Sequence, residues 1–353
     1  MKKWMHWICG ILLLLLIPAV LRAADVLPLG TRELIAEKYA GFSGVLRVWI
    51  CEGWTSGESF SGWLNECFAP FERAHEGVYV EAIYVDESAL ATLADSGVRP
   101  PDAILFAPGM PVDSSALAAL DGMPVRSALQ TCGGGLAVPV ALGGYAWATD
   151  TALPADRREL AASAPDDEPY RSWPAAMLAL CSVEAAEEEI VDPGIDLGLP
   201  AVADALEDGE AMIEPVTQRE IAQLVRLRDQ GRGTNWEIDG AAAFTDQVLL
   251  MSVVANGGER QALAEELVRH LLGEESQSAL AGRGMFNTID ALTGYAANSP
   301  YLPIDLALHA ESLIVPPAFS NAWRAQAASA LGAYLSGEGE ADALLRGLFG
   351  ISE

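Results

Sequence analysis

Basic residues are scarce in this chain. Its 353 residues include 49 Asp and Glu against 21 Lys and Arg, which gives a formal net charge of −28. Phosphates and anionic lipid headgroups would repel such a chain, so we expect no nucleic-acid partner and no membrane-surface partner. The acidity does not indicate disorder, because 51% of the residues are hydrophobic and only 20% are charged. At one domain per ~150 residues, the sequence predicts a folded protein of one or two domains.

Long apolar runs are also missing. The longest, Ile8–Leu21, spans 14 residues and falls short of the ~20 needed to cross a bilayer. It follows Lys2 and Lys3, and small residues come after it, which is typical of a secretory signal peptide. We therefore expect residues 1–23 to be removed on export, with an uncleaved anchor as the alternative. Cys9 lies too early in the run for a lipoprotein attachment site.

Cysteine and histidine are few, and their spacing does not favour a metal site. The chain has five cysteines and four histidines, and no pair of cysteines has CxxC spacing, so we expect no metal ligands. Four cysteines remain after the signal peptide and allow three pairings. A disulfide between Cys51 and Cys67 and buried free thiols both stay open. The four are Cys51, Cys67, Cys132 and Cys181.

Motifs of the common enzyme classes are absent. The sequence has no G-x-S-x-G, no H-E-x-x-H and no P-loop, and the triplet at Gly133–Gly135 lacks the lysine of a phosphate cradle. Acidic residues are plentiful, so a glycosidase-like pair of carboxylates stays open as a minor alternative. We expect no catalytic residue, no cofactor and no enzymatic activity.

The first half of the chain alternates strands with helices. Apolar or alternating runs predict strands at Val45–Ile50, Val78–Val85 and Asp102–Phe106. Helical spacing predicts helices between them, at Gly62–His75 and Glu87–Ser96, with a polar loop at Glu52–Ser61. Strand–helix–strand order is typical of a parallel α/β sheet.

The later elements are less regular. Two glycines, Gly143 and Gly144, interrupt the apolar run Leu136–Trp147 and indicate a bend or a change of sheet. Residues 155–170 are polar and predict a surface loop. We expect strands at Ala211–Val216 and Ala241–Val254, a turn at Thr217–Glu220, and helices at Thr31–Tyr39, Ile221–Gln230, Glu259–Leu272, Tyr301–Glu311 and Asn321–Leu335.

Four pieces of sequence, in order, carry a family resemblance. They are Leu46–Val85, Pro100–Gly109, Val138–Asp150 and Phe244–Phe286, the last followed by VPPAF at Val315–Phe319. With these pieces the chain resembles bacterial extracellular solute-binding proteins of ABC importers, in the carbohydrate-binding group related to maltose-binding protein. The resemblance implies a secreted monomer that binds a small solute, a carbohydrate in that group, and delivers it to importer permease subunits.

The resemblance also implies the fold. It is the α/β, two-lobed type II fold of periplasmic binding proteins, in which two sheets flanked by helices are joined by three hinge crossings, here near Val140–Gly144, Ala243–Gln247 and Leu313–Pro317. Only about 100 residues separate the first two crossings, fewer than the resemblance implies. A degenerate relative that acts as an extracellular sensor or interaction partner is therefore the alternative. The expected division is a signal peptide at 1–23, a lead helix at 24–44, lobe 1 at 45–140 and 247–312, and lobe 2 at 141–246 and 313–353.

A sugar site needs flat aromatic faces and polar groups for the hydroxyls. Trp54 follows the first strand, and Thr55 and Ser56 next to it are candidate hydrogen-bond donors. Trp236 precedes the second crossing and Trp323 follows the third, so both are candidates, as is Tyr145 at the first crossing. Core packing is the alternative for each tryptophan, and we assign Trp49, Trp63 and Trp147 to the core.

Polar candidates come from turns and crossings. Gln218 and Arg219 lie between a strand and a helix, where an arginine fork can bind a carboxylate or paired hydroxyls. Asp246 is a candidate acceptor, and Pro108 and Gly109 follow the third strand, where the backbone can approach a ligand. The alternatives are a solvated arginine, a capping aspartate and a plain turn.

Overall fold

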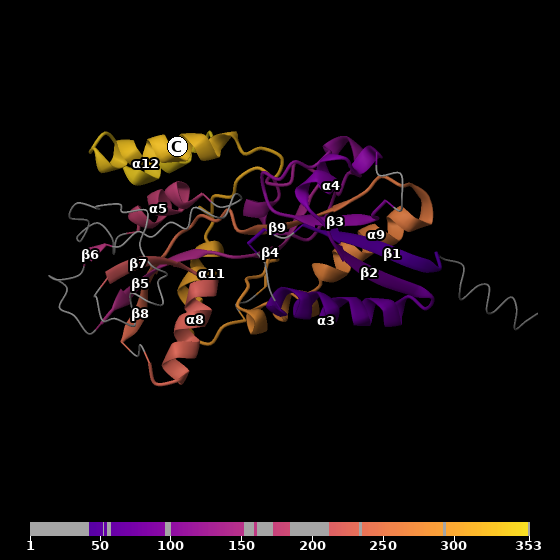
Figure 1. The fold of residues 1–353 in the computed structure, drawn as a ribbon, viewed down its shortest axis with the longest axis horizontal. Helices are drawn as coiled ribbons and strands as arrows, with labels where there is room; N and C mark the ends of the chain where they lie inside the picture. The colour runs from indigo at the N-terminus through magenta and orange to yellow at the C-terminus, as the bar shows by residue number, and fades with distance from the viewer. Residues whose placement is uncertain are drawn as a thin grey trace, which may run out of the picture.

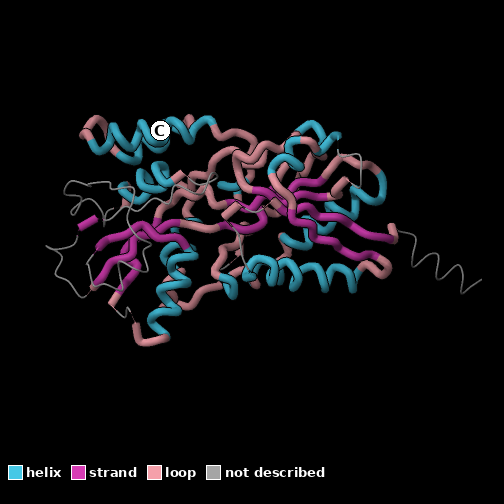
Figure 2. Tube along the Cα trace, viewed as in Figure 1, coloured by secondary structure: helices cyan, strands magenta, loops and turns pink. Residues whose placement is uncertain are grey.

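The computed structural model describes residues 42–51, 53–54, 58–95, 100–151, 159–160, 172–183, 212–232, 235–291 and 294–351. These residues form two β-sheets that follow one another along the long axis, with helices packed against them (Figures 1 and 2). Within these ranges, no helix has both the length and the apolar character that a membrane crossing requires. The expected signal peptide and the helix at Thr31–Tyr39 lie outside the described residues.

The first sheet has five strands in the order β2-β1-β3-β9-β4. β1 (Gly44–Ile50) pairs in parallel with β2 (Val78–Tyr84) and β3 (Ala103–Phe106), which confirms the parallel unit expected from the sequence. β9 (Val248–Val253) runs antiparallel between β3 and β4 (Val138–Leu142). β3, β4 and β9 are buried along their whole length, so their apolar side chains form the centre of the core.

Helices α3 (Glu58–Ala74) and α9 (Gly258–Leu271) pack together against this sheet. The indole of Trp63 is fully buried, and its N–H donates to the carbonyl of Ser276 at 2.9 Å. Ser276 belongs to the short helix α10 (Glu274–Ser278). α3 begins at Glu58, four residues before the predicted helix. The predicted polar loop at Glu52–Ser61 is therefore wrong from Glu58 onward. The predicted helix at Glu87–Ser96 is shorter in the structure, because α4 spans only Glu87–Ala91.

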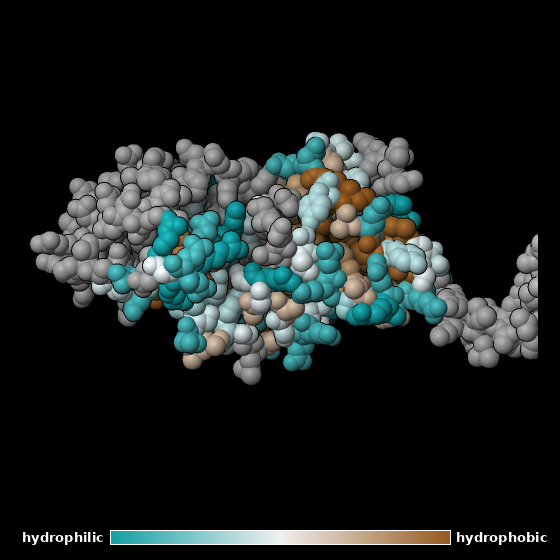
Figure 3. All heavy atoms as spheres, turned by 60° about the horizontal axis from the view of Figure 1, so that its bottom comes forward, coloured by the Kyte–Doolittle hydropathy of each residue, from teal (hydrophilic) through white to brown (hydrophobic). Residues whose placement is uncertain are grey.

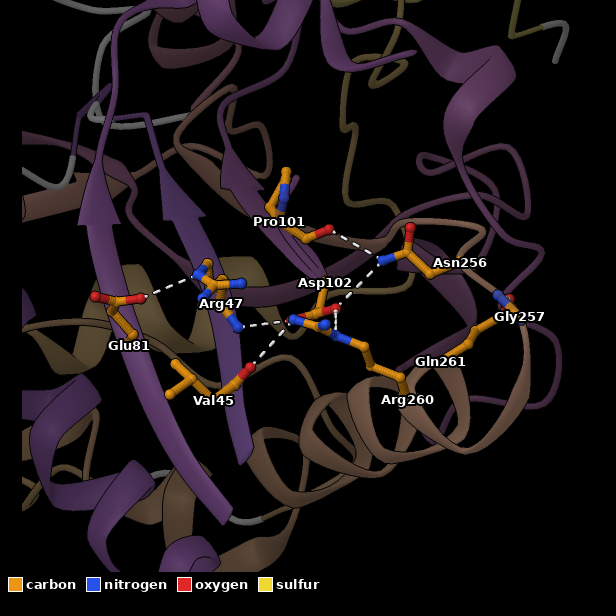
Figure 4. A network of polar contacts seen from close by, with 9 residues as sticks. All are labelled: Val45, Arg47, Glu81, Pro101, Asp102, Asn256, Gly257, Arg260 and Gln261. Atoms are coloured by element: carbon orange, nitrogen blue, oxygen red, sulfur yellow. Dashed lines mark hydrogen bonds and ion pairs between the residues drawn. The ribbon is translucent and has the colours of Figure 1, made fainter. Parts of the chain in front are cut away.

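A buried carboxylate holds the start of β3 in place. Asp102 is 1% exposed, and its oxygens accept from the backbone N–H of Arg47 at 2.7 Å and from Asn256 Nδ2 at 3.2 Å (Figure 4). The guanidinium of Arg260 donates to both carboxylate oxygens, one contact measuring 2.9 Å, and to the carbonyl of Val45 at 3.1 Å. This ion pair, between a buried carboxylate and a partly exposed guanidinium, thus connects β1, β3 and α9.

The second sheet has four strands in the order β6-β7-β5-β8. β5 (Tyr145–Asp150) runs antiparallel to both β7 (Met212–Thr217) and β8 (Trp236–Ala241), and β6 (Glu159–Leu160) is parallel to β7. The prediction at Ala241–Val254 is partly wrong, because this run holds the end of β8, a crossing and then β9. The predicted loop at 155–170 contains the short strand β6.

Helix α8 (Gln218–Asp229) corrects the predicted turn at Thr217–Glu220. The side chain of Thr217 caps the helix, and the carboxylate of Glu220 accepts from the Thr217 backbone N–H at 2.9 Å, which forms a capping box. Two otherwise unpaired N–H groups are satisfied in this way, so the helix begins at Gln218.

A layer of three helices covers one face of the second sheet. α12 (Ala322–Leu335) and α13 (Ala341–Leu348) pack on α5 (Trp173–Cys181), above the second sheet in Figure 1. Their buried side chains form a second apolar cluster with Tyr145 and Phe244. α13 was not predicted. α11 (Leu302–Leu308) packs against β8 and β5.

The four cysteines of the described chain are buried thiols outside any disulfide, so the Cys51–Cys67 disulfide is not formed. Burial raises the pKa of Cys67 and of Cys181 to about 11, and that of Cys132 to about 12. These thiols stay protonated at neutral pH, which makes them poor nucleophiles. They contribute to the protein as small apolar side chains.

The surface is unevenly divided. On the face shown in Figure 3, apolar residues gather over the part of the molecule that holds the first sheet, and hydrophilic residues surround them. Two tyrosines of the edge strand β2 are well exposed, Tyr79 at 65% and Tyr84 at 50%. The described part of the second sheet presents a mainly hydrophilic surface in the same view.

Candidate functional site

The chain passes between the two sheets three times, and the first passage is the shortest. β4 ends at Leu142 and β5 begins at Tyr145, so only Gly143 and Gly144 lie between the sheets. A Cβ on Gly143 would lie 2.5 Å from Gln218 Nε2, and a Cβ on Gly144 would lie 2.3 Å from Ile304 Cγ2. Only glycine fits this close approach, and the predicted change of sheet at this pair is confirmed.

The second crossing is hydrogen-bonded to the first. The N–H of Gly143 donates to the carbonyl of Gln247 at 2.7 Å, and the hydroxyl of Thr245 donates to the carbonyl of Gly143 at 2.8 Å. The amide of Gln218 joins both crossings, since it accepts from Gly144 N–H at 3.0 Å and donates to Gln247 Oε1 at 2.9 Å. All these side chains are buried, so the two crossings form one polar, solvent-excluded unit.

The third crossing joins the same bundle. The N–H of Ile314 donates to the carbonyl of Ala243 at 2.9 Å, and the N–H of Thr245 donates to the carbonyl of Ile314 at 3.1 Å. Further along, Ala318 donates to the carbonyl of Cys132 at 2.7 Å and accepts from the N–H of Gly109 at 2.8 Å. The three passages therefore lie side by side, and the last one is fixed to loops of the first sheet.

Asp246 is the charged centre of this region. It is fully buried, and its carboxylate accepts from the hydroxyl of Tyr145 at 2.5 Å and from the N–H of Ser172 at 2.6 Å. The guanidinium of Arg324 lies 4.0 Å away and completes a weak ion pair. The structure thus brings together two predicted site residues, Tyr145 and Asp246, but their polar atoms form a hydrogen bond with each other.

Arg324 also reaches the first sheet. Its Nη2 donates to the carbonyl of Pro108 at 3.1 Å. Gly109 has φ +83°, and a Cβ there would lie 2.9 Å from Cβ of Asn321, just before α12. The predicted close approach of the Pro108–Gly109 backbone is, in this structure, an approach to α12.

The candidate tryptophans are packed inside the protein. Trp54 and Trp236 are 4% and 5% exposed, and neither indole N–H has a hydrogen-bond partner among the described residues. The guanidinium of Arg228 lies over the ring of Trp236, 5.1 Å from its centre. Trp323 is 5% exposed and donates to the carbonyl of Ser320 at 3.2 Å. A sugar ring would reach these faces only after the surrounding side chains moved.

The remaining candidates divide between the crossings and the surface. Gln218 lies at the crossings, whereas Arg219 is exposed and its backbone N–H donates to the Thr217 hydroxyl at 3.2 Å. Thr55 and Ser56 lie outside the residues that the structure describes. Within the described ranges, no group of His, Cys, Asp or Glu side chains is arranged to hold a metal ion.

Sequence reasoning missed four members of this network: Ser172, Thr245, Gln247 and Arg324. The tetrapeptide FTDQ at Phe244–Gln247 did offer a signal, because three polar residues in succession interrupt a long apolar run. Buried polar side chains of this kind need mutual hydrogen bonds. Ser172 and Arg324 lie more than 70 residues from Asp246 and carry no comparable signal.

Solved structures share this architecture. The GacH receptor of Streptomyces glaucescens, studied without ligand and with acarbose, has a TM-score of 0.56 at 16% identity, over 88% of this chain and 100% of that one. A Bordetella ferric binding protein has a TM-score of 0.58 at 15% identity, over 84% and 100%. The MalE domain of Bdellovibrio bacteriovorus, bound to maltotriose, has a TM-score of 0.51 at 11% identity, over 86% and 97%. These similarities show the type II periplasmic-binding-protein fold.

Sequence comparison is more specific. No curated protein sequence matches the chain. The sequence profile of one family, described as bacterial extracellular solute-binding protein, matches residues 55–286, about two thirds of the chain. The matched region contains most of both sheets and the first two crossings. The predicted resemblance is confirmed, and the chain belongs to the family of bacterial extracellular solute-binding proteins.

Proposed function

We propose that this protein captures a carbohydrate between two lobes, closes around it, and delivers it to the permease subunits of an ABC importer. One observation carries the proposal: the two sheets are joined by three adjacent crossings, the first of which is only Gly143-Gly144. Closure about a few connecting residues is an established way for two-lobed proteins to enclose a ligand. The compact bundle of crossings suits that motion, since one short region can absorb the change.

The lobes follow the crossings. We propose that lobe 1 comprises residues 45–140 and 247–312, and that lobe 2 comprises residues 141–246 and 313–353. Helix α11, which belongs to lobe 1 in this division, packs against β8 and β5 of the second sheet. Residues 1–23 act as the export signal, because they combine a lysine-containing start with an apolar run. The exported protein works as a monomer outside the cytoplasm.

The carbohydrate class has three supports. Proteins of the same fold bind acarbose and maltotriose. Aromatic and planar polar side chains, including Tyr145, Gln218 and Trp323, lie around the crossings. The excess of acidic residues disfavours an anionic solute. A Bordetella neighbour binds ferric iron, so iron is the competing class that a test must include.

Thermal unfolding of residues 25–353 tests the proposal against a panel of saccharides, amino acids, polyamines and ferric citrate. A ligand at 100 times its Kd adds ~2.7 kcal/mol to the free energy of unfolding, a rise of several degrees in Tm. We expect one saccharide class to raise Tm. A rise with ferric citrate or a polyamine alone would contradict the carbohydrate class but not solute capture.

A second function has specific support. Asp246, Gln218 and Trp323 already use their polar atoms within the protein, as a fold without an open solute site would. In that case the chain acts as an extracellular sensor or interaction partner without transport. No shift with any panel member, in a protein that unfolds cooperatively, would favour this alternative.

A further inference from the structure

The edge of the first sheet that β1 and β2 form has two different faces. Successive side chains of a strand point to opposite faces, and in β1 three buried side chains alternate with three half-buried ones. The buried ones are Leu46, Val48 and Ile50, and the half-buried ones are Val45, Arg47 and Trp49. Parallel strands are as a rule covered on both faces, so the half-buried face can take a further element.

Strand β2 extends this half-buried face. The register places Val45 beside Tyr79, Arg47 beside Glu81 and Trp49 beside Ile83, and we call these residues the outer face of β1 and β2. Tyr79 is 65% exposed, and between the apolar and aromatic residues lies the ion pair of Arg47 with Glu81, which measures 3.1 Å (Figure 4). β2 is at the opposite edge of the sheet from β4, which leads into the first crossing. The outer face is therefore separate from the solute site proposed between the lobes.

The chain enters the first sheet next to this face. β1 begins at Gly44, so residues 24–41, which lie outside the described residues, are joined to β1 through Phe42 and Ser43 alone. Gly44 has φ +148°, a backbone conformation that residues with a Cβ rarely adopt, and Gly41 lies at the other end of this link. Two glycines beside so short a link let the chain reverse direction there. The preceding residues can then return along β1.

The sequence of this segment fits such a return. The helix expected at Thr31–Tyr39 has an apolar side that comprises Leu34, Ile35 and Tyr39. Lys38 lies within that side and is the only lysine after residue 23. Nine helical residues rise ~14 Å, the length of about four residues of strand, so the expected helix matches the outer face in length.

We propose that residues 31–39 dock as a helix on the outer face of β1 and β2, antiparallel to β1. Leu34, Ile35 and Tyr39 then cover the apolar and aromatic residues of the face, and Lys38 comes beside Glu81. The charges are complementary, since the side chain of Glu81 is 49% exposed and can accept from a second cation. A helix at this edge also hinders β2 from pairing with a strand of another chain. The contact is within the first lobe and does not depend on which solute the protein captures.

Thiol labelling of the full chain tests the contact, with mass spectrometry to identify each labelled position. Tyr79→Cys reports on the outer face. Tyr84→Cys is the matched reporter, because Tyr84 lies on the same strand and is 50% exposed, but pairs with Ile50 on the opposite face. We expect the thiol of Tyr79→Cys to react at least about tenfold more slowly than that of Tyr84→Cys, because the docked helix must open first.

Two substitutions in the segment identify the occupant. Ile35→Asp places a charge on the apolar side of the helix and should raise the labelling rate of Tyr79→Cys about tenfold, to that of Tyr84→Cys. Ala36→Asp is the matched control, because it introduces the same charge at the next position, which lies on the other side of the helix. It should leave the labelling of Tyr79→Cys slow.

Two results would overturn the proposal. Equal labelling of Tyr79→Cys and Tyr84→Cys, without a substitution in the segment, would show that the outer face is uncovered. Slow labelling of Tyr79→Cys that Ile35→Asp does not relieve would show that another occupant covers the face, and a rate that falls with protein concentration would identify it as a second copy of this chain. Neither result bears on solute capture, which the ligand panel tests separately.

Discussion

Asp102 and Asp246 are both fully buried, one in each of two regions of the molecule, and their surroundings differ. Asp102, in the first sheet, receives hydrogen bonds from a backbone N–H, an asparagine and a guanidinium that contacts both of its oxygens. Asp246, at the crossings, receives a tyrosine hydroxyl and a backbone N–H, with its guanidinium partner at 4.0 Å. Among the contacts between described residues, Asp102 has a guanidinium on both of its oxygens, whereas Asp246 has two neutral donors and a guanidinium nitrogen at 4.0 Å.

The origin of the partners explains the difference. The partners of Asp102 come from β1, the segment after β9, and α9, all of which belong to the first sheet and its covering helix. The partners of Asp246 come from β5, from the residue before α5, and from α12, whose arginine also holds Pro108. The contacts of Asp102 thus hold one part of the molecule together, whereas those of Asp246 join several elements around the crossings, the region about which the proposed closure would occur.

The largest effect is expected for Asp102→Asn. The substitution keeps the shape but removes the charge that compensates the half-buried guanidinium of Arg260, so we expect a loss of ~3–5 kcal/mol in the free energy of unfolding. Urea unfolding measures it. Glu81→Gln is the control, because Glu81 pairs with Arg47 at the surface and its removal should cost under ~1 kcal/mol. Similar losses for the two variants would contradict the structural role of Asp102.

A smaller loss is expected for Tyr145→Phe. The variant removes the hydroxyl that donates to Asp246 and leaves one buried carboxylate oxygen short of a donor, at a cost of ~1–3 kcal/mol in the free energy of unfolding. Tyr79→Phe changes a tyrosine that is 65% exposed and should leave stability unchanged. The same urea experiment compares the two. If Tyr145→Phe is as stable as Tyr79→Phe, the crossings do not depend on this hydrogen bond.

Arg324→Gln should affect the arrangement of the lobes more than their stability. The guanidinium contacts the Pro108 carbonyl at 3.1 Å and Asp246 at 4.0 Å, so its loss should cost ~1 kcal/mol and favour the open arrangement. Small-angle scattering should show a larger radius of gyration. Arg346→Gln removes an exposed pair with Asp342 on α13 and is the control. An unchanged radius in both variants would show that Arg324 does not hold the lobes together.

How much of the fold could be predicted from the sequence also differs between the two parts. The strands of the first sheet are apolar runs, and the predicted ranges agree with β1, β2 and β3 to within a residue. β8, with the sequence WEIDGA, mixes acidic residues and glycine with apolar ones and gave no strand signal. The start of α8 has a sequence signal, Thr217 with Glu220 three residues later, which is typical of a capping box and not of the turn predicted at Thr217–Glu220.

The candidate site was only partly predictable for a related reason. Tyr145 and Asp246 lie in segments that carry the family resemblance, and Gln218 lies between a predicted strand and a predicted helix, so the sequence offers all three as candidates. The structure places them in one network. The contacts that define this network join residues far apart in the chain, 29 positions for Gln218 with Gln247 and 101 for Tyr145 with Asp246. No local pattern encodes such pairings, since they depend on how the sheets meet.

The smallest effect compares one cysteine from each part, Cys67 on α3 and Cys181 on α5. Burial raises the pKa of each thiol to about 11, against a weaker opposing hydrogen bond from Ser276 or Tyr334. Above pH 9 the unfolded chain therefore loses these protons while the folded protein keeps them, and the free energy of unfolding falls as pH rises from about 9 to 11. At pH 9.5 we expect each thiol to contribute under ~1 kcal/mol of that fall.

Urea unfolding of Cys67→Ala and Cys181→Ala at pH 7.5 and 9.5 measures this contribution. Each variant should show a smaller pH dependence than the wild type, and by a similar amount, because burial causes both shifts. A reduction in only one variant would show that the other thiol reaches solvent in the folded protein, and that its part of the molecule opens more readily.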